Sequence, residues 1–337
     1  MLPDPPPWRR FSTLDREALK QDIERWKTLR LFAAEDDRQK ERGSSFRVSE
    51  EHPAIVDGVN AALCLRRPLL ITGLPGAGKT SLAYAIAQEL RLGPVLKWSI
   101  TAKSTLEDAL FQYDAIARLQ DVKLEESSGK QSSEKQQKNI GGYVTLGPLG
   151  TAFLPSHLPR VLLIDEIDKS DLNLPNDLLN LFEEGEFQIK ALERVKKKQP
   201  VVTVRTADEE MEAEIVRGRV RCAEFPLVVM TSNGERDFPP AFLRRCLRLK
   251  MPIPERDALV EIVESHFRSE LTEERKTAIA TLVEEFLVKR EESDRQLSTD
   301  QLLNSVYVLT QEVGETGEAW ERIKGVLWKK LSSEEDR

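Results

Sequence analysis

The fold is decided by the stretch "RRPLLITGLPGAGKTSLAYAIAQELRL", residues 66–92. It begins with a short apolar run, which predicts a buried strand, and ends with apolar spacing typical of a helix. Between them lies "GLPGAGKT", residues 73–80, which fits the pattern G-x-x-x-x-G-K-[ST] in full. A strand before this pattern and a helix after it are the setting in which such a loop binds phosphate groups. The stretch therefore predicts a phosphate-binding loop at the end of a strand.

Each residue type in this loop has a physical task. Glycines let the backbone curl so that its N–H groups face a phosphate, and the helix that follows adds the positive end of its dipole. Lys79 is expected to reach the β- and γ-phosphates, and Thr80 to offer its hydroxyl to Mg²⁺. The predicted nucleotide-binding residues are Gly73, Leu74, Pro75, Gly76, Ala77, Gly78, Lys79, Thr80 and Ser81.

A second apolar strand is predicted within "PRVLLIDEID", residues 159–168, and it ends in two adjacent carboxylates. Because ligands bind at the carboxyl ends of strands in open α/β sheets, this pair is expected beside the phosphate-binding loop. Asp165 is predicted to hold Mg²⁺ together with Thr80, and Glu166 to polarise the attacking water. A second carboxylate directly after the metal-binding aspartate favours hydrolysis over a switch that only holds nucleotide.

A further apolar strand with a polar tip is predicted within "FPLVVMTSNGE", residues 225–235. Asn233 at this tip is placed to orient the attacking water by hydrogen bonding. The alternative is a simple turn asparagine, because Ser-Asn-Gly is common turn chemistry. The position of Asn233 after the two earlier motifs favours the catalytic interpretation.

Strands and helices alternate along the middle of the chain, with another strand predicted at residues 93–100 and a helix at 52–65. This alternation predicts an α/β fold with a parallel sheet covered on both faces. Beyond Pro254 the pattern is helical only, with four candidate helices. Thr272 and Ser298 are plausible N-caps of two of them. A phosphate-loop NTPase sheet followed by an all-α domain is therefore expected.

Three regions are predicted: a Pro-rich arm with an amphipathic helix at 1–45, an α/β nucleotide-binding domain at 46–254, and a helical domain at 255–337. Residues 121–142 are polar and lack aromatic side chains, so they predict a flexible insertion. Residues 191–222 are highly charged with strand-like alternation, and they predict an extended β-hairpin that projects from the α/β domain.

The composition of the 337 residues limits the class of ligand. The net charge of −7 argues against a nucleic-acid backbone as the main ligand. The basic segment "RVKKKQ", residues 194–199, has no interleaved aromatic residue, so nucleic-acid binding is not favoured there either. Three cysteines and three histidines in no ligand spacing argue against a zinc site. The low, odd cysteine count, and the lack of a signal core or membrane-length apolar run, favour a cytoplasmic protein.

Two adjacent arginines occur in "FPPAFLRRC", residues 238–246. One interpretation is a solvated pair, because cations are favourable at the C-terminus of a helix. The other is that Arg244 or Arg245 reaches into the active site of a neighbouring copy of the chain. The stretch alone favours the solvated pair and leaves the second interpretation open.

The chain resembles the AAA+ ATPases, and within them the MoxR-like group related to dynein-type ATPases. The resemblance rests on "GLPGAGKT", "VLLIDEIDKSDLNLPNDLLNLFEEGEF", "VVMTSNGERDFPPAFLRRC" and the helical tail, and it covers about residues 45–330. The first motif is shared by all phosphate-loop NTPases, whereas the next two in this order are more specific. The resemblance implies an AAA+ core with a helical lid, ATP and Mg²⁺ as cofactors, and a homo-oligomeric ring, usually a hexamer. It also implies a motor or chaperone that remodels a protein client, often with a von Willebrand A domain partner.

The resemblance also assigns roles to individual residues. In the family, an arginine one short helix after the sensor asparagine reaches the γ-phosphate of the next subunit. The match falls best on Arg245, with Arg244 as the neighbouring alternative. The segments 121–142 and 191–222 resemble insertions that face the central pore or one rim, so client contact is an alternative to a merely solvated role for each.

The lid departs from the family pattern. The family often places a second-sensor arginine at the start of the third lid helix, but here "LSTDQLL" has Asp300 and Gln301 at that place. Either the role is absent, or another lid arginine such as Arg290 or Arg295 supplies it.

Two other functions are compatible with the same core. A nucleic-acid motor or loader is disfavoured by the net charge of −7. An ATP-dependent assembly switch that rarely hydrolyses is disfavoured by Glu166. A GTPase is disfavoured because the chain has no Asn-Lys-x-Asp motif.

Overall fold

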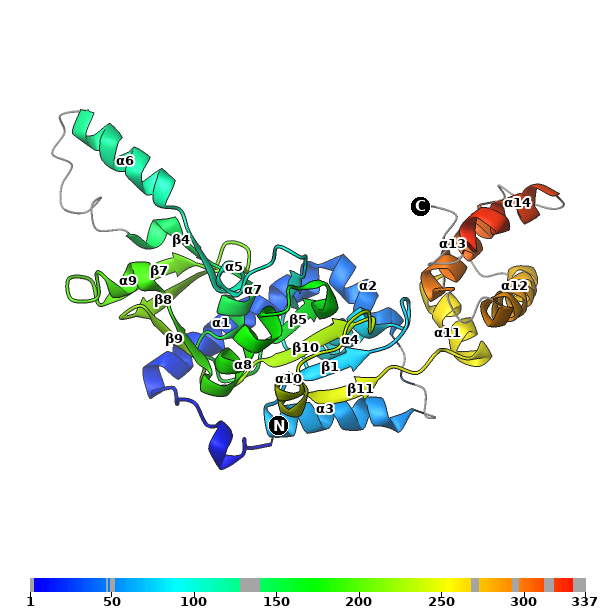
Figure 1. The fold of residues 1–337 in the computed structure, drawn as a ribbon, viewed down its shortest axis with the longest axis horizontal. Helices are drawn as coiled ribbons and strands as arrows, with labels where there is room; N and C mark the ends of the chain where they lie inside the picture. The colour runs from blue at the N-terminus through cyan, green and yellow to red at the C-terminus, as the bar shows by residue number, and fades with distance from the viewer. Residues whose placement is uncertain are drawn as a thin grey trace.

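The computed structural model describes residues 3–46, 48, 52–127, 140–267, 273–292, 297–311 and 318–329. Most of the predicted flexible insertion, the N-cap expected at Thr272 and the alternative lid arginine Arg295 lie outside these residues. The molecule is elongated, with the central sheet in the middle, the helix α6 projecting at one end and the lid helices at the other (Figure 1).

A five-stranded sheet forms the centre of the molecule, and all its strands run parallel in the order β11-β1-β10-β5-β2. The four strands that the apolar runs predict are present, and β11 is a fifth, at the edge. The strands are β1 (Leu69–Thr72), β2 (Leu96–Ser99), β5 (Val161–Asp165), β10 (Leu227–Ser232) and β11 (Leu247–Lys250). The carboxyl ends of β1, β10 and β5 are neighbours, so the three motifs that follow them meet at one edge.

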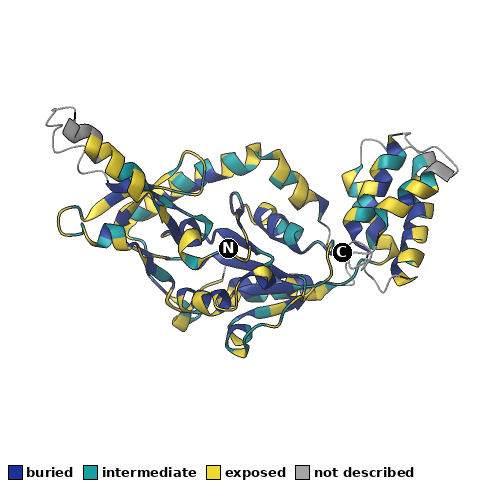
Figure 2. Ribbon diagram, turned by 45° about the horizontal axis from the view of Figure 1, so that its top comes forward, coloured by how far each residue is buried: buried dark blue, intermediate teal, exposed yellow. Residues whose placement is uncertain are grey.

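Helices cover both faces of this sheet, as the continuous apolar strands require. Alternate strand residues pack on opposite sides: Leu69 and Ile71 contact the core that contains α3 and α4, whereas Leu70 contacts the core that contains α7 and α8. The helices before the lid are α1 (Arg16–Glu35), α2 (Asp37–Ser45), α3 (Pro53–Leu65), α4 (Lys79–Glu89), α5 (Leu106–Leu110), α6 (Ala115–Ser127), α7 (Pro148–Ala152), α8 (Leu174–Glu184), α9 (Lys190–Glu193) and α10 (Pro240–Arg245). Figure 2 shows the buried strands enclosed between these layers.

The predicted hairpin is present, but it belongs to a second sheet instead of projecting alone. Strands β7 and β8 pair antiparallel from Val201↔Val216 to Arg205↔Glu212. The sheet order is β3-β4-β7-β8-β9-β6. Its inner face buries side chains such as Val202, Val204 and Ile215 in the same core as α8, because strand alternation turns the charged residues outward. The strands are β3 (Phe111–Tyr113), β4 (Val144–Leu146), β6 (Glu186–Gln188), β7 (Val201–Arg205), β8 (Glu212–Val216) and β9 (Arg219–Arg221).

Part of the predicted flexible insertion is ordered. Helix α6 continues to Ser127, and the short 3-10 helix Ile140–Tyr143 leads into β4. The polar composition of this segment therefore does not prevent helix formation at its start.

The Pro-rich arm docks on the body of the same chain. Its 3-10 helix η1 (Pro7–Arg9) ends in Arg9, whose guanidinium donates to the carbonyl oxygens of Phe182 at 2.9 Å and Arg66 at 3.1 Å. The same guanidinium lies 4.6 Å from the ring centroid of Phe225, and Phe11 stacks on that ring. These contacts fix the arm beside the end of α8.

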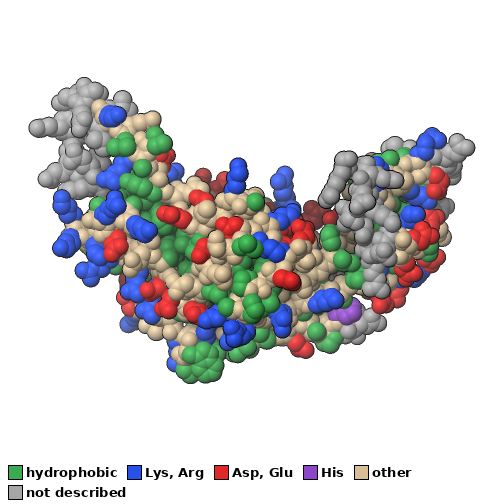
Figure 3. Space-filling model, viewed as in Figure 1, with side chains coloured by type: hydrophobic (Ala, Val, Ile, Leu, Met, Phe, Trp, Pro, Cys, Tyr) green, Lys and Arg blue, Asp and Glu red, His purple; other side chains and the backbone are tan. Residues whose placement is uncertain are grey.

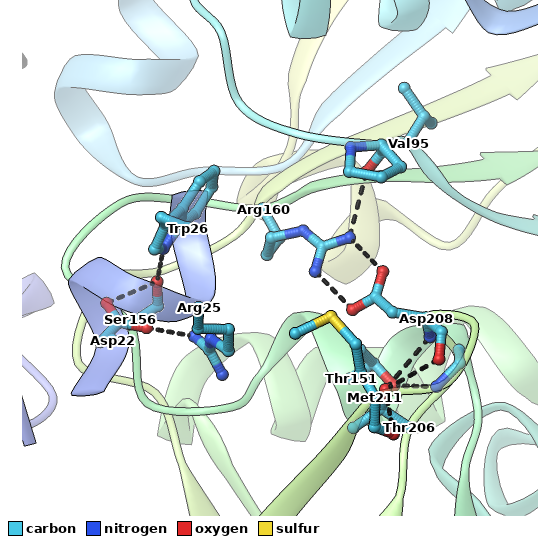
Figure 4. Close-up of polar contacts among 12 residues, drawn as sticks. Asp22, Arg25, Trp26, Val95, Thr151, Ser156, Arg160, Thr206, Asp208 and Met211 are labelled. Atoms are coloured by element: carbon cyan, nitrogen blue, oxygen red, sulfur yellow. Dashed lines mark hydrogen bonds and ion pairs between the residues drawn. The ribbon is translucent and has the colours of Figure 1, made fainter. Parts of the chain in front are cut away.

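Buried polar groups join α1 and the hairpin to the segment that leads into β5 (Figure 4). Asp22 accepts hydrogen bonds from the backbone N–H of His157 at 2.7 Å, and Trp26 donates its indole N–H to Ser156 at 2.8 Å. Arg160 and Asp208 form a bidentate ion pair with both N–O distances at 2.7 Å, and both side chains are buried. This pair ties the β7–β8 turn to the strand that carries Asp165.

We expect Arg160→Ala to lower the free energy of unfolding by about 3–5 kcal/mol, because it leaves the Asp208 carboxylate buried without its partner. Urea unfolding followed by circular dichroism measures the loss. The paired change Arg160→Met with Asp208→Leu is the control, since apolar replacement of both members of a buried pair is often neutral or stabilising. Equal destabilisation by the single and the paired change would contradict this account.

The C-terminal region forms a separate helical core around buried residues such as Leu259, Phe286 and Leu302. Its helices are α11 (Arg256–His266), α12 (Glu273–Glu292), α13 (Thr299–Thr310) and α14 (Glu318–Leu327). The N-cap predicted at Ser298 is confirmed, and Gln301 completes a capping box with it. In the part of the chain that the structure describes, no helix is long and apolar enough to cross a membrane.

Candidate nucleotide-binding site

A cavity of about 390 Å³ lies between the central sheet and the lid. Seven residues of the glycine-rich stretch line it, from Pro75 to Ser81, together with the three polar strand-end residues Asp165, Glu166 and Asn233. Apolar side chains such as Phe46, Ile55 and Ile262 line another part. The cavity therefore combines a polar end rich in backbone N–H groups with an apolar end, as a nucleotide with a phosphate tail requires.

The loop needs glycine at two positions. Gly76 and Gly78 have φ angles of 75° and 78°, in the left-handed region, and Gly78 is the N-cap of α4. A Cβ on Gly76 would lie 2.6 Å from the backbone nitrogen of Thr299 in the lid. Glycine therefore serves both the curl of the loop and its close approach to α13, and the loop has the form that cradles phosphate.

Lys79 is buried at the centre of this loop. Its ammonium group donates to the carbonyl oxygens of Gly73 and Leu74 at 2.7 and 2.8 Å and to Asn233 Oδ1 at 2.8 Å. Gly73 and Leu74 thus contribute their carbonyls, although they are not among the residues that line the cavity. Burial lowers the pKa of Lys79 below its usual value, and the nearby carboxylates, Asp168 foremost, oppose that effect.

Asp165 and Thr80 lie together, as predicted for a shared metal site. Asp165 Oδ1 accepts hydrogen bonds from the hydroxyls of Thr80 at 3.0 Å and Thr231 at 2.7 Å. Carboxylate and hydroxyl oxygens are hard donors that suit Mg²⁺, which usually binds one or two protein oxygens along with substrate phosphates. The two side chains fit such an ion.

Lys97 is a partner of Asp165 that the sequence motifs do not reveal. It lies on β2, and its ammonium group is 2.7 Å from Asp165 Oδ2. Burial alone raises the pKa of Asp165, but the hydrogen bonds from Lys97, Thr231 and Thr80 outweigh burial and lower it. The carboxylate is therefore ionised at neutral pH, and its contribution to folding stability is lost only as the pH falls through this lowered value.

Glu166 leaves the line of the strand. Its φ of 62° lies in the left-handed region, and its N–H donates to Thr231 Oγ1 at 2.9 Å. Its carboxylate is half-exposed and pairs with Lys169 at 2.8 Å, a hydrogen bond that is the main cause of the raised pKa of Lys169. The backbone turn thus directs Glu166 away from Asp165, to a place from which it can contact water.

Asp168 is a buried residue that fixes the tip carrying Asn233. One carboxylate oxygen accepts hydrogen bonds from Ser232 Oγ at 3.0 Å, the N–H of Asn233 at 2.8 Å and the N–H of Glu235 at 3.2 Å. These bonds join the segment after β5 to the segment after β10. The motifs in the sequence did not predict this role. The feature that points to it is the second aspartate of Asp-Glu-Ile-Asp, three residues after Asp165.

Should the site hydrolyse ATP, Asp168→Ala is expected to reduce kcat by about 10- to 100-fold. The change would release Asn233, the residue predicted to orient the attacking water, and displacement of such a side chain by about 1 Å has an effect of that order. KM for ATP should change much less, since Lys79 and the loop remain. Asp168→Asn retains one acceptor oxygen and should recover part of the loss. A variant with normal kcat per folded molecule and reduced stability would mean that Asp168 is only structural.

The two arginines of α10 have different surroundings. Arg245 is half-buried and pairs with Glu183 of α8, and it also donates to the carbonyl of Ala241 at 3.2 Å. Arg244 is exposed, and its side chain has no partner among the described residues. Neither arginine is among the residues that line this chain's own cavity.

No described lid arginine lines the cavity, where the lid contributes Thr299 and Asp300 instead. Arg290 donates to the carbonyl of Pro254 at 3.0 Å and lies over the ring of Phe286, so it holds the lid. Gln301 caps α13 and donates to the carbonyl of Leu327 at 2.9 Å. Within the described ranges, no group of three or more His, Cys, Asp or Glu side chains could hold a metal ion.

Comparison with known proteins identifies the family. Among curated proteins, none matches this chain. Domain III of the replication initiation protein DnaA from Thermotoga maritima is similar in structure, with 17% sequence identity and a TM-score of 0.38 over 84% of this chain and 93% of that chain. The model of the AAA domain (dynein-related subfamily) matches residues 68–246. Because this match covers more than half of the chain, the protein belongs to the dynein-related subfamily of AAA domains.

Proposed function

We propose that this protein is a Mg²⁺-dependent ATPase that works as a homo-oligomeric ring. Six subunits, the usual number in the MoxR-like group that it resembles, is the proposed ring size. The observation that carries the proposal is the convergence of Lys79, Thr80, Asp165 and Asn233 at one cavity, joined by hydrogen bonds of 2.8 Å and 3.0 Å. Membership of the AAA family, whose domains generally hydrolyse nucleotides, supports it.

In this proposal each residue that one subunit contributes to its own nucleotide site has a separate task. The loop N–H groups and Lys79 bind the phosphates, while Thr80 and Asp165 hold Mg²⁺. Bound Mg²⁺ would neutralise charge on the phosphate oxygens. Glu166 accepts a proton from the attacking water, and Asn233, fixed by Asp168, orients that water.

A neighbouring subunit completes the site in this account. Arg245, or its neighbour Arg244, would reach the γ-phosphate of the next subunit. The support is that neither lines its own cavity and that Arg244 is exposed. Because the arginine face and the nucleotide face are different surfaces, the proposed contact between copies is head-to-tail. Such contacts form a ring when the rotation from one copy to the next closes, as the proposal requires.

Remodelling of a protein client is the work we propose for the ring. Thr299 and Asp300 of the lid line the nucleotide cavity, so nucleotide exchange can rock the lid against the sheet. The proposal includes three further features that fit the MoxR-like group. The insertions contact the client, a partner with a von Willebrand A domain takes part, and the protein is cytoplasmic. A nucleic-acid motor remains the alternative, which a salt-sensitive mobility shift would support.

The test is turnover of ATP by the full chain, with Lys79→Ala as the inactive control. We expect Mg²⁺-dependent phosphate release that Lys79→Ala abolishes. ATP binding without turnover would instead support an assembly switch, and failure to bind ATP would overturn the proposal.

A further inference from the structure

Five cations gather at the outer end of the second sheet, and we call this surface the basic end. Two contacts bring its parts together: Ile189 donates to the carbonyl of Gly218 at 2.8 Å, and Arg217 donates to that of Pro200 at 2.6 Å. Figure 3 shows blue side chains over this region, at the left of the view where Figure 1 labels α9. The basic end consists of Lys190, Arg194, Lys197, Lys198 and Arg217.

These five side chains are exposed, and none forms an ion pair with a carboxylate of the described residues. The acidic groups nearby are already engaged: Glu193 pairs with Lys196 at 2.9 Å, and Glu186 pairs with Arg219 and Arg221. The chain as a whole has a net charge of −7, whereas this surface has an excess of unpaired positive charges. Such a cluster creates a positive potential that attracts an anionic partner.

Exposed apolar side chains lie beside these cations. Val201 and Val216 are partners in the β7–β8 register, and they are 44% and 55% exposed. Each is close in sequence to the contact between Pro200 and Arg217. This surface therefore combines positive charge with exposed apolar area. It is complementary to a partner that has negative charges and apolar side chains.

A polypeptide fits this surface better than a nucleic acid does. Residues 190–200 and 216–219 contain no aromatic side chain on which a base could stack. Glu212 and Glu214 are exposed farther along the same hairpin, and they would repel any anion there, so a long phosphate backbone that ran along the hairpin is disfavoured. A short acidic segment confined to the basic end avoids these two carboxylates. We propose that the basic end binds an acidic polypeptide segment that also carries apolar side chains, and, resting on the proposed function, that this segment belongs to the client.

The test is fluorescence anisotropy with a labelled peptide of repeated Glu-Glu-Leu units, using the full chain. The variant is Arg194→Glu with Lys197→Glu and Lys198→Glu. Its matched control is Arg16→Glu with Arg38→Glu and Lys103→Glu, which changes the net charge equally at exposed side chains outside the basic end. We expect the variant to bind the peptide at least about tenfold more weakly at low salt, and the control to bind like wild type.

Three results would overturn the proposal: no peptide binding by wild type, equal weakening in the variant and the control, or tighter binding of oligo-dT than of the peptide with loss in the same variant. Lys79→Ala separates this inference from the ATPase proposal, because it should still bind the peptide. If the wild-type chain binds the peptide but does not hydrolyse ATP, the proposed peptide-binding role of the basic end stands. Only the proposal that the peptide belongs to the client of an ATPase is then wrong.

Discussion

Replacement of Glu166 by Gln is expected to reduce ATP hydrolysis by about 10²–10⁴-fold, the usual contribution of a positioned general base. Gln keeps the size of the side chain but cannot accept the proton of water. The left-handed backbone at Glu166, its bond to Thr231 and the loop around Lys79 should be unchanged. ATP should therefore still bind, and phosphate release and fluorescent-nucleotide affinity should be measured on the same preparation.

Lys169→Ala is the matched control for this variant. It removes the 2.8 Å partner of Glu166 and leaves the carboxylate in place. Hydrolysis should then stay within a fewfold of wild type, because an exposed ion pair contributes little. Normal hydrolysis by Glu166→Gln, or equal losses in the two variants, would remove Glu166 from the proposed mechanism.

Loss of the arginine that reaches the γ-phosphate of the next subunit is expected to reduce kcat by about 10³–10⁵-fold, a larger effect than that of Glu166→Gln. We expect it for Arg245→Ala, the better match to the family position, and a small change for Arg244→Ala. For Arg245 to reach a neighbour, its ion pair with Glu183 must open. Glu183→Gln weakens that pair and should therefore leave hydrolysis intact or raise it.

The opposite pattern has a clear structural meaning. If Arg244→Ala is the inactive variant, the exposed Arg244 is the residue that reaches the neighbouring subunit's nucleotide. Arg245 then holds α10 against α8 through Glu183. Arg245→Ala should then lower the urea midpoint while sparing hydrolysis. Normal activity and stability in both variants would make the pair surface charge.

The central sheet could be predicted because parallel strands are buried on both faces and appear as apolar runs. The edge strand β11 was missed, since its sequence "LRLK" alternates and half of it is exposed. The second sheet was missed apart from its hairpin. Strands β3, β4, β6 and β9 have three residues each, and their pairing joins segments far apart in the chain.

The site motifs predict which residue types meet, but not the residues that position them. Lys97 reaches Asp165 only because β2 lies next to β5 in the sheet, with Ser99 opposite Asp165 in the register. Asp168 acts on the backbone after β10, a contact that depends on strand order. The docking of Arg9 at the end of α8 likewise depends on tertiary structure, because a Pro-rich arm has no local preference for a partner.

The most direct test of a shared active site is hydrolysis by a mixture of two inactive variants. One is Lys79→Ala, and the other combines Arg244→Ala with Arg245→Ala, so the result does not depend on which arginine acts. The account predicts that specific activity of wild type rises with protein concentration, that each variant alone is nearly inactive, and that the mixture recovers activity at interfaces with one intact half from each. Hydrolysis that is independent of concentration, with a mixture no more active than its parts, would contradict it.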